Sequence, residues 1–324
     1  MKLLITGGAG YLGSILWELA LNRLWTKHRV RVVDNFMHRQ PSLSHLVHNH
    51  NLEIICGDVR NHVSTDMSWP DVIVPLAAIV GAPACERDEN AAHTTNFWAV
   101  KDLVRRASKD QAIIYPNTNS GYGVGGETEC TEDSPLLPVS LYGKTKVNAE
   151  AEVLEHPRST VFRFATLFGF SPRMRLDLMV NDFVYRAAHD KALTLFEPHF
   201  RRNFLHVRDA ANLILAAAED YTGETEQKIG GPAPAFSRRR VFNAGLSSAN
   251  MTKAQLCDRI AEHVPGFTYS TAAVGKDPDQ RDYVVSNARL EACGWFPNHT
   301  LDNGVAELVR GYAMPLGSPY RNIS

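Results

Sequence analysis

The start of the chain constrains its fold more than any other feature. A short apolar segment, Lys2–Thr6, runs directly into Gly7-Gly8-Ala9-Gly10-Tyr11-Leu12-Gly13. From Tyr11 to about Arg23, apolar residues then recur at helical spacing (Leu12, Ile15, Leu16, Leu19). We therefore expect a buried strand, a glycine-rich turn and an amphipathic helix. Such a turn presents backbone N–H groups and a helix N-terminus to a diphosphate, because no Cβ blocks the close approach.

Strands and helices alternate through the first half of the chain. Patterning predicts further strands at 30–33, 52–56, 72–76, 112–115 and 160–164, with helices at about 90–108 and 142–154. Strands that alternate with helices imply crossover connections and a mostly parallel sheet. The predicted fold class is α/β, a doubly wound parallel sheet of the Rossmann type.

After about residue 170 this alternation loosens. Helices are expected at 176–190, 208–219, 252–263, 287–293 and 301–312, with a strand near 193–196. We expect residues 1–170 to form a dinucleotide-binding domain. Residues 171–324 would form mainly a smaller, discontinuous substrate-binding region, with some segments returning to the sheet. The stretch 221–240 is rich in Gly, Pro and charge, and we interpret it as a mobile surface insertion.

Composition excludes several classes of protein. Lys plus Arg total 34 and Asp plus Glu total 35, a net charge of −1 that argues against a general nucleic-acid binder. An apolar content of 44% excludes a disordered chain. No apolar run is long enough to span a bilayer. The five cysteines lie far apart and form no CxxC pair, which argues against a zinc site or a disulfide framework. We expect a cytoplasmic protein without a metal, and interpret His45, His48 and His50 as solvated loop residues.

Two aspartates follow predicted strands. Asp34 ends the second strand, 21 residues after Gly13. A carboxylate at that position accepts hydrogen bonds from a ribose diol and repels a 2′-phosphate, which favours NAD over NADP. Asp58 follows the third strand, where an adenine would lie. For each of them, a turn or cap aspartate is the alternative interpretation.

A tyrosine and a lysine share one face of the helix predicted at 142–154. Tyr142 and Lys146 stand at positions i and i+4. An ammonium beside a phenol favours the phenolate, so Tyr142 could act near neutral pH as a general base toward an alcohol, and as an acid in the reverse direction. The carbon that bears this alcohol would pass its hydride to a nicotinamide. Downstream of a dinucleotide loop, the pair indicates a dehydrogenase-type site.

Further motifs carry a family resemblance. Besides the glycines and the Tyr142/Lys146 pair, these are Leu76-Ala77-Ala78, Asn96, Thr118 with Tyr122-Gly123, and the segment 202–209. Over nearly its whole length the chain resembles the extended short-chain dehydrogenase/reductase family of nucleotide-sugar epimerases and dehydratases. Within that family, segments 75–83, 115–123, 171–177 and 281–287 are similar to the GDP-manno-heptose C4 dehydrogenase group of capsule-sugar pathways.

The resemblance implies a set of site residues. Thr118, Tyr142 and Lys146 would be catalytic, with Thr118 bonded to the reacting C4 oxygen, although a plain strand-end threonine is the alternative. Residues expected to contact NAD are Gly7, Gly10, Tyr11, Leu12, Gly13, Asp34, Asn35, Asp58, Val59, Leu76, Ala77, Ala78, Asn96, Tyr142 and Lys146. Residues expected to contact the nucleotide-diphosphate sugar are Val80, Asn119, Ser120, Thr166, Arg173, Arg175, Asn181, Arg202 and Arg281. Arg202 and Arg281 would hold the diphosphate, or be ordinary surface arginines.

Departures from the family pattern indicate which of the family's reactions this chain could catalyse. Family 4,6-dehydratases carry Asp-Glu after the catalytic threonine, where this chain has Asn119 and Ser120. Neither side chain is a useful acid or base near pH 7, so dehydration is disfavoured, and the absence of a glutamate at 120 weakens decarboxylation.

Two outcomes of C4 oxidation then remain. A C4 dehydrogenase acting on GDP-manno-heptose or a similar GDP-sugar is favoured, and a 4-epimerase is the alternative. Pro75 and Thr166 stand where many epimerases have His and Asn. A small-alcohol dehydrogenase and a non-catalytic NAD-binding sensor are rival interpretations. The resemblance also implies a homodimer or higher homo-oligomer, formed through helices at about 90–107 and 142–155.

Overall fold

A seven-stranded parallel sheet occupies the centre of the computed structural model, which describes residues 1–22, 28–61, 66–124, 128–224, 236, 241–272 and 282–314. The strand order is β11-β6-β5-β4-β1-β2-β3. The strands are β1 (Lys2–Thr6), β2 (Arg29–Asp34), β3 (Leu52–Cys56), β4 (Val72–Pro75), β5 (Ala112–Thr118), β6 (Ser159–Phe164) and β11 (Val241–Ala244). The order reverses between β1 and β4, and ligands of open α/β sheets bind at the carboxyl ends of the strands at such a point.

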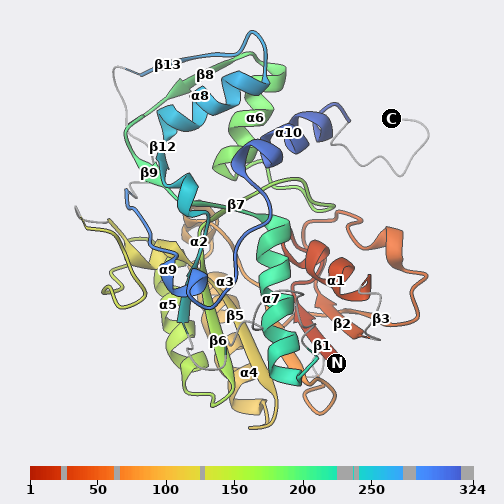
Figure 1. Cartoon of the computed structure of the whole chain (residues 1–324). Coiled ribbons are helices and arrows are strands. Elements are labelled where there is room, and N and C mark those ends of the chain that lie inside the picture. Colours follow the sequence, from red (N-terminus) through yellow and green to blue (C-terminus); the bar gives the residue numbers. More distant parts are fainter. Residues whose placement is uncertain are drawn as a thin grey trace.

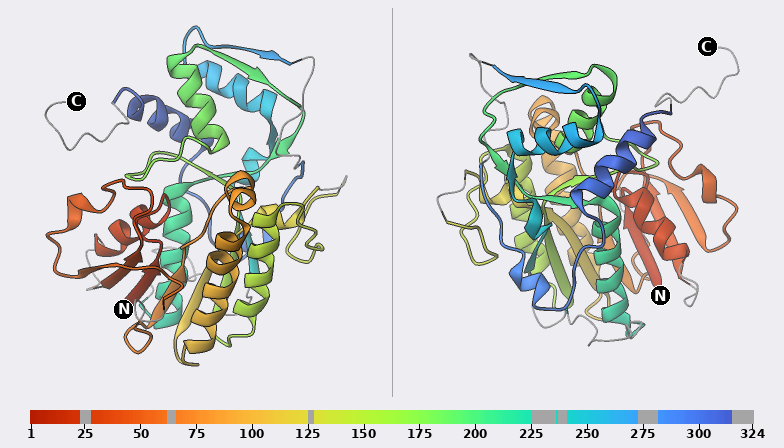
Figure 2. Two further views of the ribbon diagram at one scale, coloured as in Figure 1. Left: turned by 180° about the vertical axis from the view of Figure 1, so that it is seen from behind. Right: turned by 45° about the horizontal axis from the view of Figure 1, so that its top comes forward.

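Helices cover both faces of this sheet. On one face lie α1 (Gly13–Leu21) and α7 (Val207–Thr222), and on the other α4 (Ala99–Arg106) and α5 (Leu141–Leu154). Figure 1 shows the first pair in front of the sheet, and the reverse view in Figure 2 brings the second pair forward. Successive strand residues divide between the layers, because side chains alternate along a strand. Leu3 and Ile5 pack with α1 and α7, whereas Leu4 packs with α4 and α5.

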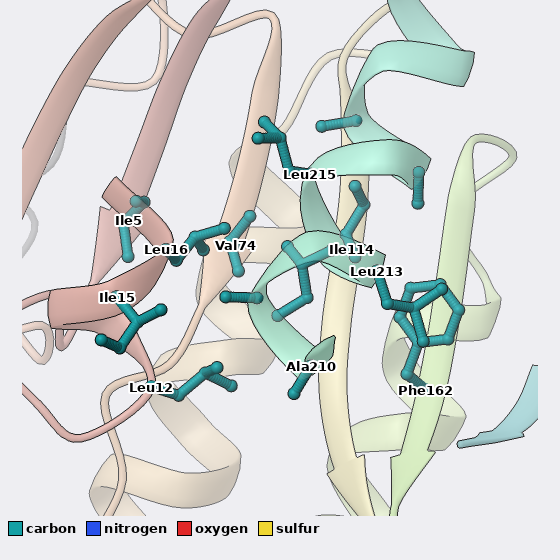
Figure 3. Packing of buried hydrophobic residues seen from close by; sticks show 14 of the residues in the cluster. Ile5, Leu12, Ile15, Leu16, Val74, Ile114, Phe162, Ala210, Leu213 and Leu215 are labelled. Carbon is teal, nitrogen blue, oxygen red and sulfur yellow. The ribbon is translucent and has the colours of Figure 1, made fainter. Parts of the chain in front are cut away.

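The larger core fills the space between the sheet and the α1/α7 layer. Figure 3 shows Ile5, Val74 and Ile114 from three neighbouring strands facing Leu16 of α1 and Leu213 of α7. All five side chains are buried. The contact between α1 and α7 joins the first helix of the chain to one from its second half, so the N-terminal strand–turn–helix unit is rigidly supported.

A smaller lobe lies over the carboxyl ends of the strands, at the top of Figure 1. Its core is formed by α6 (Met179–His189), α8 (Lys253–His263) and α10 (Leu301–Gly311). Around them run three two-stranded pairs: β7 (Thr166–Phe168) with β10 (Phe204–His206), β9 (Arg201–Arg202) with β12 (Met251–Thr252), and β8 (Ala192–Leu195) with β13 (Thr268–Thr271). Among the described residues, no helix combines the length and the apolar character needed to cross a membrane.

The remaining helices are short. They are α2 (Ala82–Arg87), α3 (Glu89–His93) and α9 (Ala288–Glu291), together with 3₁₀ turns at Ser44–Leu46, Asn119–Tyr122 and Ser247–Ala249. A π-helical turn, Thr94–Trp98, joins α3 to α4 and carries Asn96. Such turns are rare and are frequent at functional sites.

The sequence-based fold prediction is confirmed, with corrections of detail. The sheet is parallel and doubly wound, and strands β1 and β3 have the predicted bounds. Phe236, assigned to a surface insertion, is instead fully buried against Phe162 and Phe242, because its apolar ring completes the core between the sheet and α7. The other residues of 225–240 lie outside the described part of the chain. The domain boundary near residue 170 stays a prediction.

Candidate active site

The glycine-rich turn between β1 and α1 is held tightly in place. Gly7 has a φ of +71°, and a Cβ there would lie 2.5 Å from the backbone nitrogen of Ala77, just beyond β4. A Cβ on Gly13 would lie 2.6 Å from the Cα of Gly8. Leu12 stands at the N-cap of α1, and its apolar side chain cannot cap the helix. The Ser14 N–H bonds to the Gly10 carbonyl at 2.9 Å and the Ile15 N–H to the Leu12 carbonyl at 3.2 Å, so the turn leads directly into the helix. The positive end of the α1 dipole therefore lies at this glycine-rich turn, which suits an anion.

Asp34 connects this turn to the end of β2. Its Oδ2 accepts a hydrogen bond from the Ala9 N–H at 2.9 Å, and its Oδ1 accepts one from the Phe36 N–H at 2.8 Å. A carboxylate oxygen has lone pairs to spare for a ribose hydroxyl. Asp58 lies two residues after the end of β3, where hydrogen bonds from Arg60 lower its pKa. Asn35 accepts from the Met37 N–H at 3.1 Å.

Hydrogen bonds fasten the nucleotide turn to the small lobe, and we call this set the interlobe clasp. The Tyr11 hydroxyl donates to the Gly169 carbonyl at 2.6 Å and accepts from Asn181 Nδ2 at 3.2 Å. Ser171 Oγ donates to the Tyr11 carbonyl at 2.7 Å and lies 3.0 Å from Ser14 Oγ. All five residues are buried. The loop that begins at Gly169 therefore lies directly on the phosphate-binding turn.

Two asparagines expected at the site have mainly protein partners. Asn181 also accepts from the Gly169 N–H at 3.0 Å and donates to the Arg175 carbonyl at 2.9 Å. Asn96 accepts from the Ile79 N–H at 2.8 Å, and its Nδ2 donates to the Ile79 carbonyl at 2.9 Å and to Thr145 at 3.3 Å. Both are fully or almost fully buried, so the structure gives each a supporting place. Their contacts with substrate or cofactor stay predictions.

The expected catalytic residues meet where β5 ends and α5 begins. Thr118 is the last residue of β5; its hydroxyl donates to Ser120 Oγ at 2.9 Å and accepts from the Ser120 N–H at 3.1 Å. Ser140 caps α5 by accepting from the Gly143 N–H at 3.1 Å. A Cβ on Gly143 would lie 3.3 Å from the Ser120 carbonyl, so this glycine allows the first turn of α5, with Tyr142, to approach the end of β5.

Lys146 lies beneath Tyr142 on the same helix face. Its Nζ donates to the Pro116 carbonyl at 2.7 Å and stands 3.9 Å from the centre of the Tyr115 ring. Burial lowers the pKa of this ammonium to about 7, and the charge of Glu150 acts in the opposite direction. The lysine is thus buried, positioned by β5 and able to place positive charge beside the Tyr142 phenol.

Residues expected on the substrate side come from the small lobe and its loops. The Arg175 guanidinium pairs with Asp177, with Nε 3.1 Å from Oδ1. Burial acts to lower the pKa of Arg175, but its hydrogen bonds and the charges of Asp177, Tyr142 and Tyr11 raise it overall. Arg175 therefore lies near the proposed base and the clasp. Arg173 lies close enough to Asp34 for their charges to interact, which puts it on the cofactor side of this loop.

Arg202 is buried beside the segment that follows Arg281. Its guanidinium carbon lies 5.7 Å from the centre of the Tyr283 ring, and Nη1 donates to the Arg201 carbonyl at 2.9 Å. Arg201 forms the ion pair with Asp282, at 3.0 Å. Arg281 itself lies outside the described residues.

The remaining substrate candidates differ in burial. Val80 is 39% exposed and Thr166, on β7, is partly buried. Asn119 is only 1% exposed, and neither of its side-chain polar atoms has a hydrogen-bond partner among the described residues.

Sequence reasoning missed Ser14, Ser171 and Glu150. Glu150 could have been found, because it stands four residues beyond Lys146 and so on the same helix face. The two serines join segments 157 residues apart, and a single sequence carries no signal for that contact.

The fold and this turn define a dinucleotide-binding α/β protein with a tyrosine–lysine pair at the end of its central strands. Residues 3–230 match the NAD dependent epimerase/dehydratase family, and the chain belongs to that family. It is an NAD-dependent enzyme of the nucleotide-sugar type, and the turn before α1, with Asp34 beside it, fits that cofactor.

Relatives cover nearly the whole chain. The chain is 30% identical to "Uncharacterized UDP-glucose epimerase YtcB" of Bacillus subtilis, over 85% of this chain and 91% of that protein. It is 26% identical to UDP-glucuronic acid decarboxylase 6 of Arabidopsis thaliana, over 98% and 91%. Among solved structures, UDP-N-acetylglucosamine 4-epimerase from Methanobrevibacter ruminantium has the same fold (TM-score 0.79, 17% identity, 96% and 98% covered). UDP-glucuronic acid 4-epimerase from Bacillus cereus is similar as well (TM-score 0.77, 22% identity, 97% and 99% covered).

Proposed function

We propose that this protein is a nucleoside-diphosphate-sugar 4-epimerase that oxidises C4, keeps the cofactor bound, and returns the hydride to the other face of the ketone. One observation carries the oxidation step. The Lys146 ammonium, buried and fixed on the Pro116 carbonyl, lies one helical turn from Tyr142, and Thr118 ends the same strand as Pro116. This is the arrangement that proton removal from a secondary alcohol needs.

Each residue of this group has a distinct task. Tyr142 takes the proton of the C4 hydroxyl while the C4–H bond breaks, and gives it back when the ketone is reduced. Lys146 stabilises the phenolate by its charge. The Thr118 hydroxyl, which donates to Ser120 Oγ in the free protein, turns to donate to the C4 oxygen when the sugar binds. Bound NAD supplies the acceptor for the hydride.

The two residues after Thr118 argue against elimination. Loss of the C6 hydroxyl from a 4-keto sugar needs a base that takes the C5 proton and an acid that protonates the leaving hydroxyl, and Asn119 and Ser120 supply neither near pH 7. The amide of Asn119 is buried without a protein partner among the described residues, and an unsatisfied buried amide is costly. We infer that a polar substituent of the sugar bonds to it.

The interlobe clasp supports epimerisation over net oxidation. A dehydrogenase that releases its ketone must exchange or reoxidise its cofactor at every turnover. In this chain, Tyr11 and Ser14 of the phosphate-binding turn are bonded to Gly169, Ser171 and Asn181 of the small lobe. Release of a dinucleotide through this contact would require the lobes to separate. An enzyme that holds its cofactor through the cycle is compatible with the clasp.

A C4 dehydrogenase of the GDP-manno-heptose type is the second candidate. It is supported by the segments 75–83, 115–123, 171–177 and 281–287, which resemble that group and would place this protein in capsule-sugar synthesis. In both candidates the diphosphate would lie against Arg202, because a guanidinium suits paired phosphate oxygens. Asp282 and Tyr283, the two residues that follow Arg281 in the sequence, lie beside Arg201 and Arg202.

The test is to incubate the full-length protein with NAD and GDP-, UDP-, CDP- and dTDP-sugars, then analyse the products by chromatography and mass spectrometry. A new peak of unchanged mass supports the epimerase. A product lighter by two hydrogens supports the dehydrogenase, and loss of water refutes the argument from Asn119 and Ser120. Turnover of small alcohols that survives Arg202→Ala, without turnover of any nucleotide sugar, would replace the proposal with a small-alcohol dehydrogenase.

A further inference from the structure

A buried carboxylate lies behind the tyrosine–lysine pair. Glu150 stands four residues beyond Lys146 and eight beyond Tyr142, so all three share one face of α5. Its side chain is 3% exposed. Arg163 of β6 binds it with two nitrogens: Nη2 donates to Oε1 at 2.6 Å, and Nε lies 3.2 Å and 3.3 Å from the two oxygens. Such a fork-shaped contact fixes the orientation of the carboxylate.

The same carboxylate ties the helix to β5. Asn117 donates from Nδ2 to Glu150 Oε2, and Asn117 is paired in register with Arg163 on the neighbouring strand. The residue before it, Pro116, accepts the hydrogen bond from Lys146. Helix α5 is therefore fastened to β5 at two successive residues, and Thr118 is the next but one after Pro116. A shift of β5 against α5 would move Thr118 relative to Tyr142.

Charge gives Glu150 a second task. Among the described residues, the titratable and charged groups near Lys146 include Tyr142 and Glu150 on α5, Tyr115 on β5, and Arg163 on β6 through its pair with Glu150. From the small lobe, the charge of Arg175 interacts with Tyr142. From the π-helical turn, the neutral side chain of Asn96 donates a hydrogen bond to Thr145, the residue before Lys146. Glu150 is the group whose charge opposes the effect of burial on the pKa of Lys146.

We propose that Glu150 is a positioning residue of the active site, which holds β5 and α5 in register and balances the positive charge of Lys146. It does not touch the substrate; it acts through Asn117 and Lys146. This inference rests on the roles proposed above for Thr118, Tyr142 and Lys146. It explains why a carboxylate is retained in the core, where an unpaired one would be costly.

The test separates charge from shape. Glu150→Gln keeps the shape and removes the charge, whereas Glu150→Asp keeps the charge and shortens the reach. Because Glu150→Gln leaves Arg163 buried without a counter-ion, which destabilises a fold, the double variant Glu150→Gln/Arg163→Gln is made as well. Folding of each variant is checked by circular dichroism and thermal unfolding.

The first readout needs no substrate. Lysine side chains labelled with ¹³C are titrated by NMR in the full-length protein, and the Lys146 signal is assigned with Lys146→Arg. We expect Lys146 to titrate about 1 to 2 pH units lower in Glu150→Gln, lower than the wild type in the double variant, and near the wild type in Glu150→Asp. An unchanged titration in both charge-removing variants overturns the proposal.

The second readout is the pH dependence of kcat and KM with a nucleotide sugar that the wild type turns over. We expect the alkaline limb of kcat to move to lower pH in Glu150→Gln with little change in KM, and Glu150→Asp to restore its position. An equal loss of kcat at every pH, with the limb in place, would show a merely structural role and overturn the inference. The two proposals can fail separately. If the Lys146 titration moves in Glu150→Gln but the wild type turns over no nucleotide sugar, the charge balance is supported and the proposed function is refuted.

Discussion

The Tyr11→Phe substitution would test whether the interlobe clasp retains the cofactor. It removes one hydroxyl that donates to the Gly169 carbonyl at 2.6 Å and accepts from Asn181 at 3.2 Å. Burial raises the pKa of this hydroxyl, so it stays a neutral donor at any physiological pH. The Tyr11 ring is 6% exposed and would remain in place. A buried carbonyl left without its donor costs about 1–3 kcal/mol.

The expected kinetic effect follows from that free energy. If the clasp must open before the cofactor leaves, its loss accelerates release by about 5-fold to 150-fold, since each 1.4 kcal/mol is about a factor of ten. The assay loads the protein with NADH, adds excess NAD and follows the loss of bound-NADH fluorescence. Tyr312→Phe is the matched control, because the Tyr312 hydroxyl donates to the Asn181 backbone carbonyl at 2.9 Å and makes no contact with the nucleotide turn in the described hydrogen bonds.

We expect Tyr312→Phe to lower stability and leave the release rate unchanged. If Tyr11→Phe is destabilised by the same amount as Tyr312→Phe and releases NADH at the wild-type rate, the clasp does not gate the cofactor. That result would remove the structural argument for the epimerase over the dehydrogenase.

Three further predictions address the site and the surface. Tyr142→Phe should lower turnover by about 10²-fold to 10⁴-fold, measured as product formed at saturating sugar, and should leave the NADH affinity within twofold of the wild type. A variant that keeps its biological effect without turnover would favour the non-catalytic NAD-binding sensor. The pKa of Lys146 is about 7 in the folded protein against an ordinary 10.5, so between these pH values the unfolded chain binds more protons at this residue. The free energy of unfolding should therefore rise with pH over this range, by up to roughly 5 kcal/mol. Denaturant titrations of the cofactor-free protein measure this rise, and Lys146→Met should lack it. Trp98 is 55% exposed on the π-helical turn between α3 and α4. If these helices form the interface of a homodimer, Trp98→Glu should yield monomers in analytical ultracentrifugation. A wild type that sediments as a monomer would contradict the expectation.

The fold could be predicted where the physics is local. β1, the turn at Gly7 to Gly13 and α1 follow from apolar patterning and from glycines that the packing requires. β11 was missed, because its four residues follow a polar stretch and form a strand only by pairing with β6. The short pairs β7/β10 and β9/β12 were missed for the same reason: each strand has two or three residues, too few for a periodicity.

The site could be predicted as a group of residues but not as a set of contacts. Spacing alone places Tyr142 and Lys146 on one face of α5, and the structure agrees. It does not reveal that Asp34 bonds the nucleotide turn, or that the amide of Asn181 is taken up by Tyr11, Gly169 and Arg175. Those contacts join segments far apart in the chain, so they depend on how the two lobes pack.

The clasp also links the two halves of the proposed site. Asn181 donates hydrogen bonds to both the Tyr11 hydroxyl and the Arg175 carbonyl. Ser171, two residues before Arg173 in the sequence, donates to the Tyr11 carbonyl. The loop that carries both arginines is thus built on the phosphate-binding turn. A dinucleotide that orders this turn would order the loop as well, at no further cost in chain entropy. The sugar nucleotide should therefore bind more tightly to the cofactor-loaded protein than to the cofactor-free protein. Because such coupling is reciprocal, the bound sugar nucleotide should strengthen cofactor binding by the same factor. Calorimetric titration of UDP and GDP into the protein with and without NAD measures both arms of this cycle, and equal affinities would mean that the loop is already ordered without the cofactor.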